Sequence, residues 1–174
     1  VQEVEELREC VKNFDSNLGK FYELELKGRE YMIDVSYERR KLLAKFHRDY
    51  VNDIVILSKR SRRELIGLID ERLENSKEVL RYTKHVSSWI KKSVMELKLK
   101  IPSSELEKLD KTVKIQTEQN YNESNFLFSL KELQAYLLRV DYTIEDGQIL
   151  FYEDATLERF NQLGLVYDTA LEKY

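Results

Sequence analysis

The sequence has very little cysteine, proline and glycine: one Cys, one Pro and five Gly among 174 residues. Its single cysteine, Cys10, excludes a disulfide within the chain. Because turn-forming residues are so rare, the composition favours a few long helices over many short elements. No apolar run approaches the ~20 residues that a membrane-spanning helix needs. No signal peptide opens the sequence, which begins at Val1 rather than Met and so leaves an upstream targeting segment open.

The common motifs of catalysis and metal binding are also missing. No two of the five glycines are close enough for a phosphate-binding loop, and there is no HExxH, paired-cysteine or GxSxG motif. The two histidines, His47 and His85, lie on different predicted helices. Asp49 and Asp53 follow His47, but the spacing to Asp49 and the surrounding basic run disfavour a metal cluster. We therefore predict no catalytic, cofactor-binding or metal site, and a protein that is not an enzyme.

What the sequence does contain is charge and regularly spaced apolar residues. Hydrophobic residues make up 42% of the chain and charged residues 35%, and the length is that of one ordinary domain with a core of its own. We predict a single domain over residues 1–174. Its class is predicted to be all-α: an elongated antiparallel bundle of three or four long helices, with a small β-hairpin before the last helix.

The charge is unevenly distributed along the chain. The net charge is −3, yet residues 39–63 are strongly basic and residues 101–174 are acidic. The basic residues that form the candidate contact for an anionic partner are Arg39, Arg40, Lys41, Lys59, Arg60, Arg62 and Arg63. They fit either a membrane surface with anionic head groups or a solvated helix end. Nucleic acid is disfavoured, because residues 58–65 contain no aromatic side chain on which a base would stack.

The first predicted helix covers residues 1–58, with a bend near Gly28 as one option. Its beginning carries an apolar stripe at heptad spacing, which predicts a coiled-coil contact with a partner helix. The stripe consists of Val4, Leu7, Val11, Phe14, Leu18 and Phe21. A capping box of Ser61 and Glu64 predicts the start of a second helix over residues 62–100. The alternative is that the first two helices are continuous.

The second helix has Ser76, Thr83 and Ser87 within its apolar stripe, where small residues allow a neighbouring helix to approach. Pro102, and a capping box that starts at Ser104, predict a break and then a third helix over residues 104–140. The middle of the third helix, residues 115–125, is polar. It fits an exposed turn of helix, a kink, or a line of Gln and Asn side chains inside the bundle.

A hairpin over residues 142–152 and a last helix over residues 155–173 complete the prediction. Asp146 and Gly147 suit a two-residue type I′ turn, in which both positions need positive φ. Asp154 or Thr156 would cap the last helix. The expected packing joins the hairpin's Ile144, Ile149 and Phe151 to Leu137 or Leu138 and to Leu157 or Phe160.

The end of the chain, "LQAYLLRVDYTIEDGQILFYEDATLERFNQL", resembles the end of a group of small bacterial envelope lipoproteins of unknown function. The matching residues are Gly147, Ile149 and Phe151 of the hairpin, Asp154 one place later than in that group, and then Asn161 and Leu163. The resemblance covers about the last quarter of the chain, and no lipobox precedes Cys10. It implies a helical bundle outside the cytoplasm without known catalysis.

Two functions are compatible with these observations. The first is a non-enzymatic envelope or surface protein that acts through contacts with another protein or with the membrane surface. The second is an intracellular, cytoplasmic coiled-coil adaptor or assembly subunit, which pairs through the apolar stripe of its first helix. In both cases the partner is a protein that the sequence does not identify, and a homodimer is compatible with the stripe.

Overall fold

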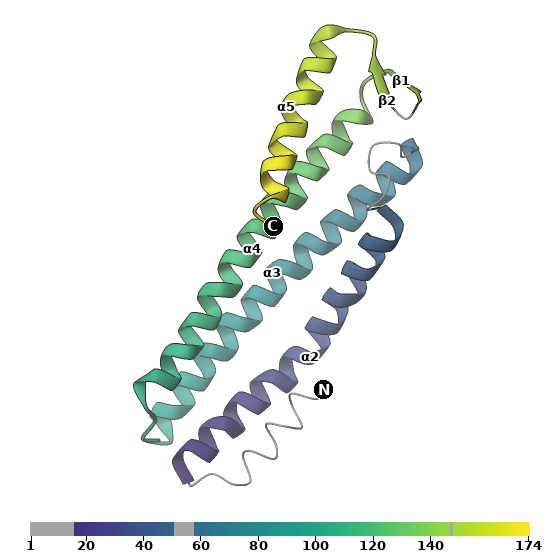
Figure 1. Cartoon of the computed structure of the whole chain (residues 1–174). Helices are drawn as coiled ribbons and strands as arrows, with labels where there is room; N and C mark the ends of the chain where they lie inside the picture. Colours follow the sequence, from purple (N-terminus) through teal and green to yellow (C-terminus); the bar gives the residue numbers. More distant parts are fainter. Residues whose placement is uncertain (1–15, 51–57, 147) are drawn as a thin grey trace. The chain divides into compact units, whose positions relative to one another are not determined.

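A computed structural model of the protein describes residues 16–50, 58–146 and 148–174. In this part of the chain the helices are α2 (Ser16–Tyr50), α3 (Lys59–Glu96), α4 (Ser103–Leu137) and α5 (Asp154–Leu171). The strands β1 (Tyr142–Glu145) and β2 (Gln148–Phe151) form an antiparallel hairpin between α4 and α5. The predicted all-α class, with a small hairpin before the last helix, is therefore confirmed (Figure 1).

The start of α3 differs from the prediction by three residues. The helix begins at Lys59, and the Ser58 hydroxyl oxygen accepts a hydrogen bond from the backbone N–H of Ser61 at 3.1 Å. Ser58 is thus the residue that caps the helix, and Ser61 lies inside its first turn. The predicted capping box of Ser61 and Glu64 is wrong, because an equally good capping residue stands three positions earlier.

The end of α3 and the start of α4 also lie earlier than predicted. Lys98 has a φ of 51°, and the N–H groups of Lys98 and Leu99 donate to the carbonyl oxygens of Met95 and Val94 at 3.1 and 3.0 Å. These two bonds form a Schellman motif, which ends α3 before Pro102 is reached. Because α4 then begins at Ser103, Ser104 lies in its first turn instead of capping it.

The hairpin has the two-residue turn that the sequence predicts. Glu145 pairs with Gln148, so the loop has two residues, and Asp146 has the positive φ of 51° that a type I′ turn needs. Gly147 lies outside the described residues. Phe151 contacts Phe160 of α5 with 5.0 Å between ring centroids, as predicted, whereas Ile144 remains 40% exposed. The N-cap of α5 is Glu153, without a side-chain bond, and not Asp154 or Thr156.

The chain divides into two compact units. The first unit comprises Val1–Glu38 and Lys77–Glu118, and the second comprises Arg39–Ser76 and Gln119–Tyr174. Since α2, α3 and α4 each contribute a segment to both units, the single domain over residues 1–174 stays a prediction.

The first unit has a core in which three helices meet. Its buried residues are Phe21, Leu24, Ile90, Val94 and Leu109. Gly28 of α2 faces Val86 of α3 so closely that a Cβ atom on the glycine would lie 2.5 Å from a Val86 methyl group. Gly28 therefore allows close approach of two helix backbones, and α2 runs through this position without interruption.

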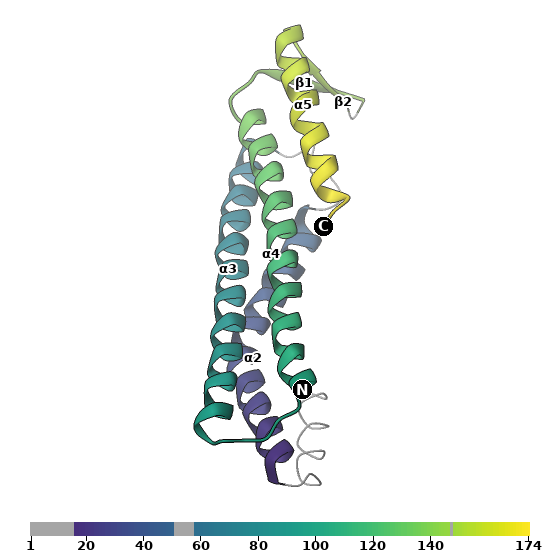
Figure 2. The ribbon, with the colours of Figure 1, turned by 90° about the vertical axis from the view of Figure 1, so that its left-hand side faces the viewer.

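The second unit has a separate core on α3 and α4, which α5 partly covers. Its buried residues are Leu65, Leu68, Ile69, Leu73, Phe126, Leu127 and Leu130, with Tyr167 and Ala170 of α5 packed against them. After the hairpin, α5 returns along the later part of α4 in both ribbon views (Figures 1 and 2). The Tyr136 hydroxyl of α4 donates to the carbonyl oxygen of Thr156 at 2.9 Å and holds the beginning of α5.

Candidate functional site

The second unit contains a group of buried polar side chains around Glu123 of α4. Arg72 donates from Nε to Oε1 of Glu123 at 2.9 Å, and Ser76 donates from its hydroxyl to Oε2 at 2.5 Å. Arg39 of α2 donates to the same Oε2 at 3.2 Å, and Asn120 donates to the Ser76 hydroxyl at 2.9 Å. Glu123 and Arg72 are only 1% and 2% exposed. Such a buried ion pair persists only when its remaining polar atoms are also bonded.

Tyr174 connects the end of the described chain to this group. Its hydroxyl is hydrogen-bonded to Nη2 of Arg72, whose guanidinium lies 5.5 Å from the centre of the Tyr174 ring. The ring itself stacks on Phe126 with 4.9 Å between centroids and an interplanar angle of 7°. We call this set, which consists of Arg39, Arg72, Ser76, Asn120, Glu123 and Tyr174, the polar cluster. Its bonds are internal and link α2, α3, α4 and Tyr174, which follows α5, within one unit.

The polar cluster explains the polar middle of the third predicted helix. Residues 115–125 are helical throughout, and α4 runs without interruption from Ser103 to Leu137. Of the three options left open by the sequence, a line of polar side chains inside the bundle comes nearest, but its centre is Glu123 rather than Gln or Asn.

A signal for this arrangement was present in the sequence. The steps of three and four residues that place Leu109 and Val113 on one stripe continue through Gln116, Asn120 and Glu123 to Leu127. Polar residues at stripe positions of an otherwise apolar face indicate a buried polar network. Ser76, predicted only as a small residue for close helix approach, supplies a hydroxyl to it.

Arg62 does not belong to a surface that could receive an anionic partner. Its side chain is 0% exposed, and Nη1 donates a hydrogen bond to Oε1 of Gln134 in α4. Its guanidinium also lies 5.8 Å from the centre of the Tyr142 ring. The prediction of Arg62 as an anionic contact is wrong, because this arginine faces α4 and β1 in the interior of the second unit.

The other basic candidates have different surroundings. Lys41, Lys59, Arg60 and Arg63 are exposed, and Arg60 forms an ion pair with Glu64 at 3.0 Å. Arg39 is 26% exposed and bound to Glu123. The side chain of Arg40 lies outside the described part of the structure. Exposed cations thus remain at Lys41 of α2 and near the start of α3, but Arg39 and Arg62, the two with buried partners, contribute to the interior instead.

Of the six residues in the apolar stripe of the first predicted helix, two lie within the described part of the structure. Phe21 is fully buried in the core of the first unit, and Leu18 packs against that core. These two positions therefore belong to the protein's own interior and are not available to a partner helix. The other four, Val4, Leu7, Val11 and Phe14, lie outside the described residues.

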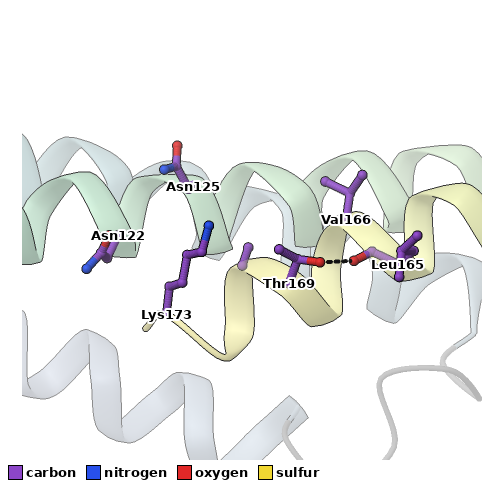
Figure 3. Close-up of a pocket in the computed structure, with 7 residues that line it drawn as sticks. Asn122, Asn125, Leu165, Val166, Thr169 and Lys173 are labelled. Atoms are coloured by element: carbon purple, nitrogen blue, oxygen red, sulfur yellow. Dashed lines mark hydrogen bonds between the residues drawn. The ribbon is translucent and has the colours of Figure 1, made fainter.

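A groove of about 350 Å³ runs between α4 and α5 in the second unit. It is lined by Asn122, Asn125, Leu165, Val166, Thr169, Ala170 and Lys173, and we call it the α4–α5 groove. Leu165 and Val166 are 69% and 53% exposed. Lys173, in the turn that follows α5, extends toward α4 on the side of Asn122 and Asn125, as Figure 3 shows. The Thr169 hydroxyl donates to the carbonyl oxygen of Leu165 at 2.8 Å (Figure 3).

Three ionisable groups have pKa values shifted by their surroundings. In the first unit, burial raises the pKa of Glu25 above its ordinary value, although nearby Arg29 opposes the shift. Also there, the hydrogen bond to Glu105 raises the pKa of Lys108. In the second unit, burial raises the pKa of Tyr167, and the adjacent Asp168 adds to the shift. None of these three side chains lines the α4–α5 groove.

The described residues contain no group of three or more His, Cys, Asp or Glu side chains arranged to hold a metal ion. Within the same residues, no helix has the length and apolar character needed to cross a membrane.

Comparison of the chain with protein-family models, with curated proteins and with solved structures gives no match.

Proposed function

We propose that this protein is a non-enzymatic helical interaction protein, which binds a protein partner through the α4–α5 groove. The observation that carries the proposal is the exposure of Leu165 and Val166 beside that groove. Single exposed apolar side chains are common on any protein surface. Two adjacent ones that line a groove, with the amides of Asn122 and Asn125 on its other wall, provide an apolar surface with polar groups beside it on which a partner can pack.

The alternatives within the second unit have less support. The polar cluster has its charged groups bonded to one another, and a binding or catalytic role would require those bonds to open. The cations at the first turn of α3 offer an anionic membrane surface three separate exposed side chains, Lys59, Arg60 and Arg63, of which Arg60 already pairs with Glu64. A protein contact at the groove is therefore our first choice, and a membrane-surface contact the second.

For the compartment we propose the bacterial cell envelope, on the basis of the resemblance of the chain's last quarter to envelope lipoproteins. Fractionation of cells that express the full-length gene product, followed by intact-mass measurement, tests this placement. A lipid-modified product in the membrane fraction supports it. An unprocessed product in the cytoplasm contradicts it and favours the intracellular adaptor.

The groove itself is tested with a photo-crosslinking amino acid at position 165 in the full-length protein inside its native cells. A matched control carries the same group at position 95, because Met95 is similarly exposed, at 71%, and does not line the groove. We expect a discrete crosslinked species from position 165 only, and its loss when Val166→Glu is added. Equal crosslinking from both positions, or none from either, contradicts a binding role for the groove.

A further inference from the structure

We propose that the partner of the α4–α5 groove is the segment of residues 3–15 of a second copy of this chain. This inference rests on the proposed function and names its partner. It joins two features: an apolar stripe in the sequence and a groove in the second unit.

In the sequence, residues 3–15 carry a narrow apolar stripe at helical spacing. The stripe positions are Val4, Leu7, Val11 and Phe14, spaced in steps of three and four. The same spacing continues to Leu18 and Phe21, which lie in the core of the first unit. The sequence pattern thus predicts an amphipathic helix whose apolar face is one side chain wide, as in helices that pack into a groove between two others.

The residues that line the groove are spaced so that such a helix can pack against them. Leu165 and Thr169 lie four residues apart on α5, and Val166 and Ala170 form a second row beside them. Lys173 follows in the turn after α5 ends at Leu171. The small side chains Thr169 and Ala170 occupy the middle of the groove, between the exposed aliphatic residues and Lys173. Small residues at this place allow the backbone of a third helix to approach, while Leu165 and Val166 supply apolar contacts.

The charges beside the two surfaces are complementary. In the heptad that places Val4 and Val11 at the first apolar position, the flanking positions include Glu3, Arg8 and Asp15. The groove presents the Lys173 amine, and the exposed carboxylates of Asp168 in α5 and of Glu172 at its C-cap lie outside the groove lining. The carboxylates of the segment can pair with the amine of the groove, and its arginine can pair with the carboxylates outside the lining. A purely acidic or purely basic partner would be able to form only one of these two kinds of pair.

Symmetry favours a second copy as the source of the segment. In a two-fold dimer each copy supplies one segment and one groove, so that the same contact is made twice. Two weak contacts then support each other, because the second forms within an assembly already joined by the first.

The native Cys10 allows a direct test, because it is the only cysteine and lies within the proposed segment. We would replace Thr169 with cysteine in the full chain and oxidise the protein mildly. The control is Thr112→Cys, since Thr112 is also exposed and also donates its hydroxyl to the carbonyl oxygen four residues earlier. We expect T169C to form a covalent dimer joined by Cys10 and the new cysteine, with at least tenfold more of this species than T112C. Peptide mapping identifies the linkage.

A disulfide between position 10 and position 169 within one copy overturns the second-copy assignment, and so does a dimer joined only through two Cys10 residues. Sedimentation equilibrium of the unmodified protein gives an independent measurement. We expect Val166→Glu and Leu7→Glu each to weaken dimerisation at least tenfold, and Met95→Glu to leave it unchanged. If the protein is monomeric while photo-crosslinking at position 165 still captures another protein, only this inference fails. If crosslinking fails as well, the proposed function fails with it.

Discussion

Arg72 and Glu123 form an ion pair with 2.9 Å between Nε and Oε1, in a position where both side chains are almost completely buried. Removal of one charge from such a pair leaves the other charge buried without its main partner. Replacement of both by apolar residues removes the desolvation penalty together with the attraction. The pair is therefore expected to be strongly coupled in its effect on stability.

We expect Glu123→Leu alone to lower the free energy of unfolding by about 3–5 kcal/mol. The double variant R72M/E123L should recover most of that loss, because Arg39 is 26% exposed and can turn toward water. Urea unfolding of the wild type, the two single variants and the double variant gives the coupling energy. Equal destabilisation by E123L and by the double variant would contradict the account.

Gly28 is expected to resist replacement by alanine, although alanine favours helix by about 1 kcal/mol. A Cβ atom here would lie 2.5 Å from a methyl carbon of Val86. The resulting overpacking costs about 1–3 kcal/mol, so we expect Gly28→Ala to lower the melting temperature. The matched control is Gly67→Ala, where a Cβ atom would meet nothing within 4 Å and the helix should be stabilised. A second change, Val86→Ala, should reduce the effect at Gly28. Similar behaviour of Gly28→Ala and Gly67→Ala in thermal unfolding would show that the close approach is absent.

Lys98 occupies the left-handed backbone region, with a φ of 51°, at the end of α3. A residue with a Cβ atom is strained by about 1–2 kcal/mol in this region, and glycine is not. Lys98→Gly is therefore expected to raise the free energy of unfolding by about 0.5–1 kcal/mol after the larger chain entropy of glycine is subtracted. The control is Lys100→Gly, because Lys100 is also exposed but has no positive φ. It should be neutral or destabilising in chemical denaturation, and a gain at both positions would argue against a specific effect at Lys98.

Glu25 is expected to give the first unit a stability that declines as the pH rises. Burial raises its pKa in the folded protein above the ordinary value of 4.5. The folded state then binds the proton more tightly than the unfolded state, so the contribution is present below pH 4.5 and is lost as the pH rises through the folded pKa.

Glu25→Gln should remove this dependence and stabilise the protein at neutral pH relative to the wild type. The measurement is the free energy of unfolding between pH 4 and pH 8, roughly the range in which a raised glutamate pKa titrates. Exposed Glu23, two residues earlier on α2, provides the control variant Glu23→Gln. Parallel pH profiles for the wild type and Glu25→Gln would contradict the predicted role of Glu25.

Local patterns in the sequence determined which elements form. Apolar residues in steps of three and four specify long helices, and Asp146 before Gly147 specifies a two-residue hairpin turn, because both depend on interactions between near neighbours. Helix ends were less well determined. Ser58 and Ser61 are both good capping residues, and the choice of Ser58 depends on where the chain enters α3. At the other end of α3, Lys98 has a positive φ. A glycine at this position would have predicted that conformation, whereas a lysine does not.

Tertiary structure alone decided which charged side chains face inward. Arg62 belongs to the same basic run as Arg60 and Arg63, yet it is buried and bonded to Gln134, 72 positions along the chain. Likewise, the role of Glu123 depends on Arg72 and Arg39, which come from other helices. A charge is tolerated in the interior only where a distant residue supplies its partner. The sequence therefore determined the helices and the turn by itself, whereas long-range packing decided the polar cluster and the groove between α4 and α5.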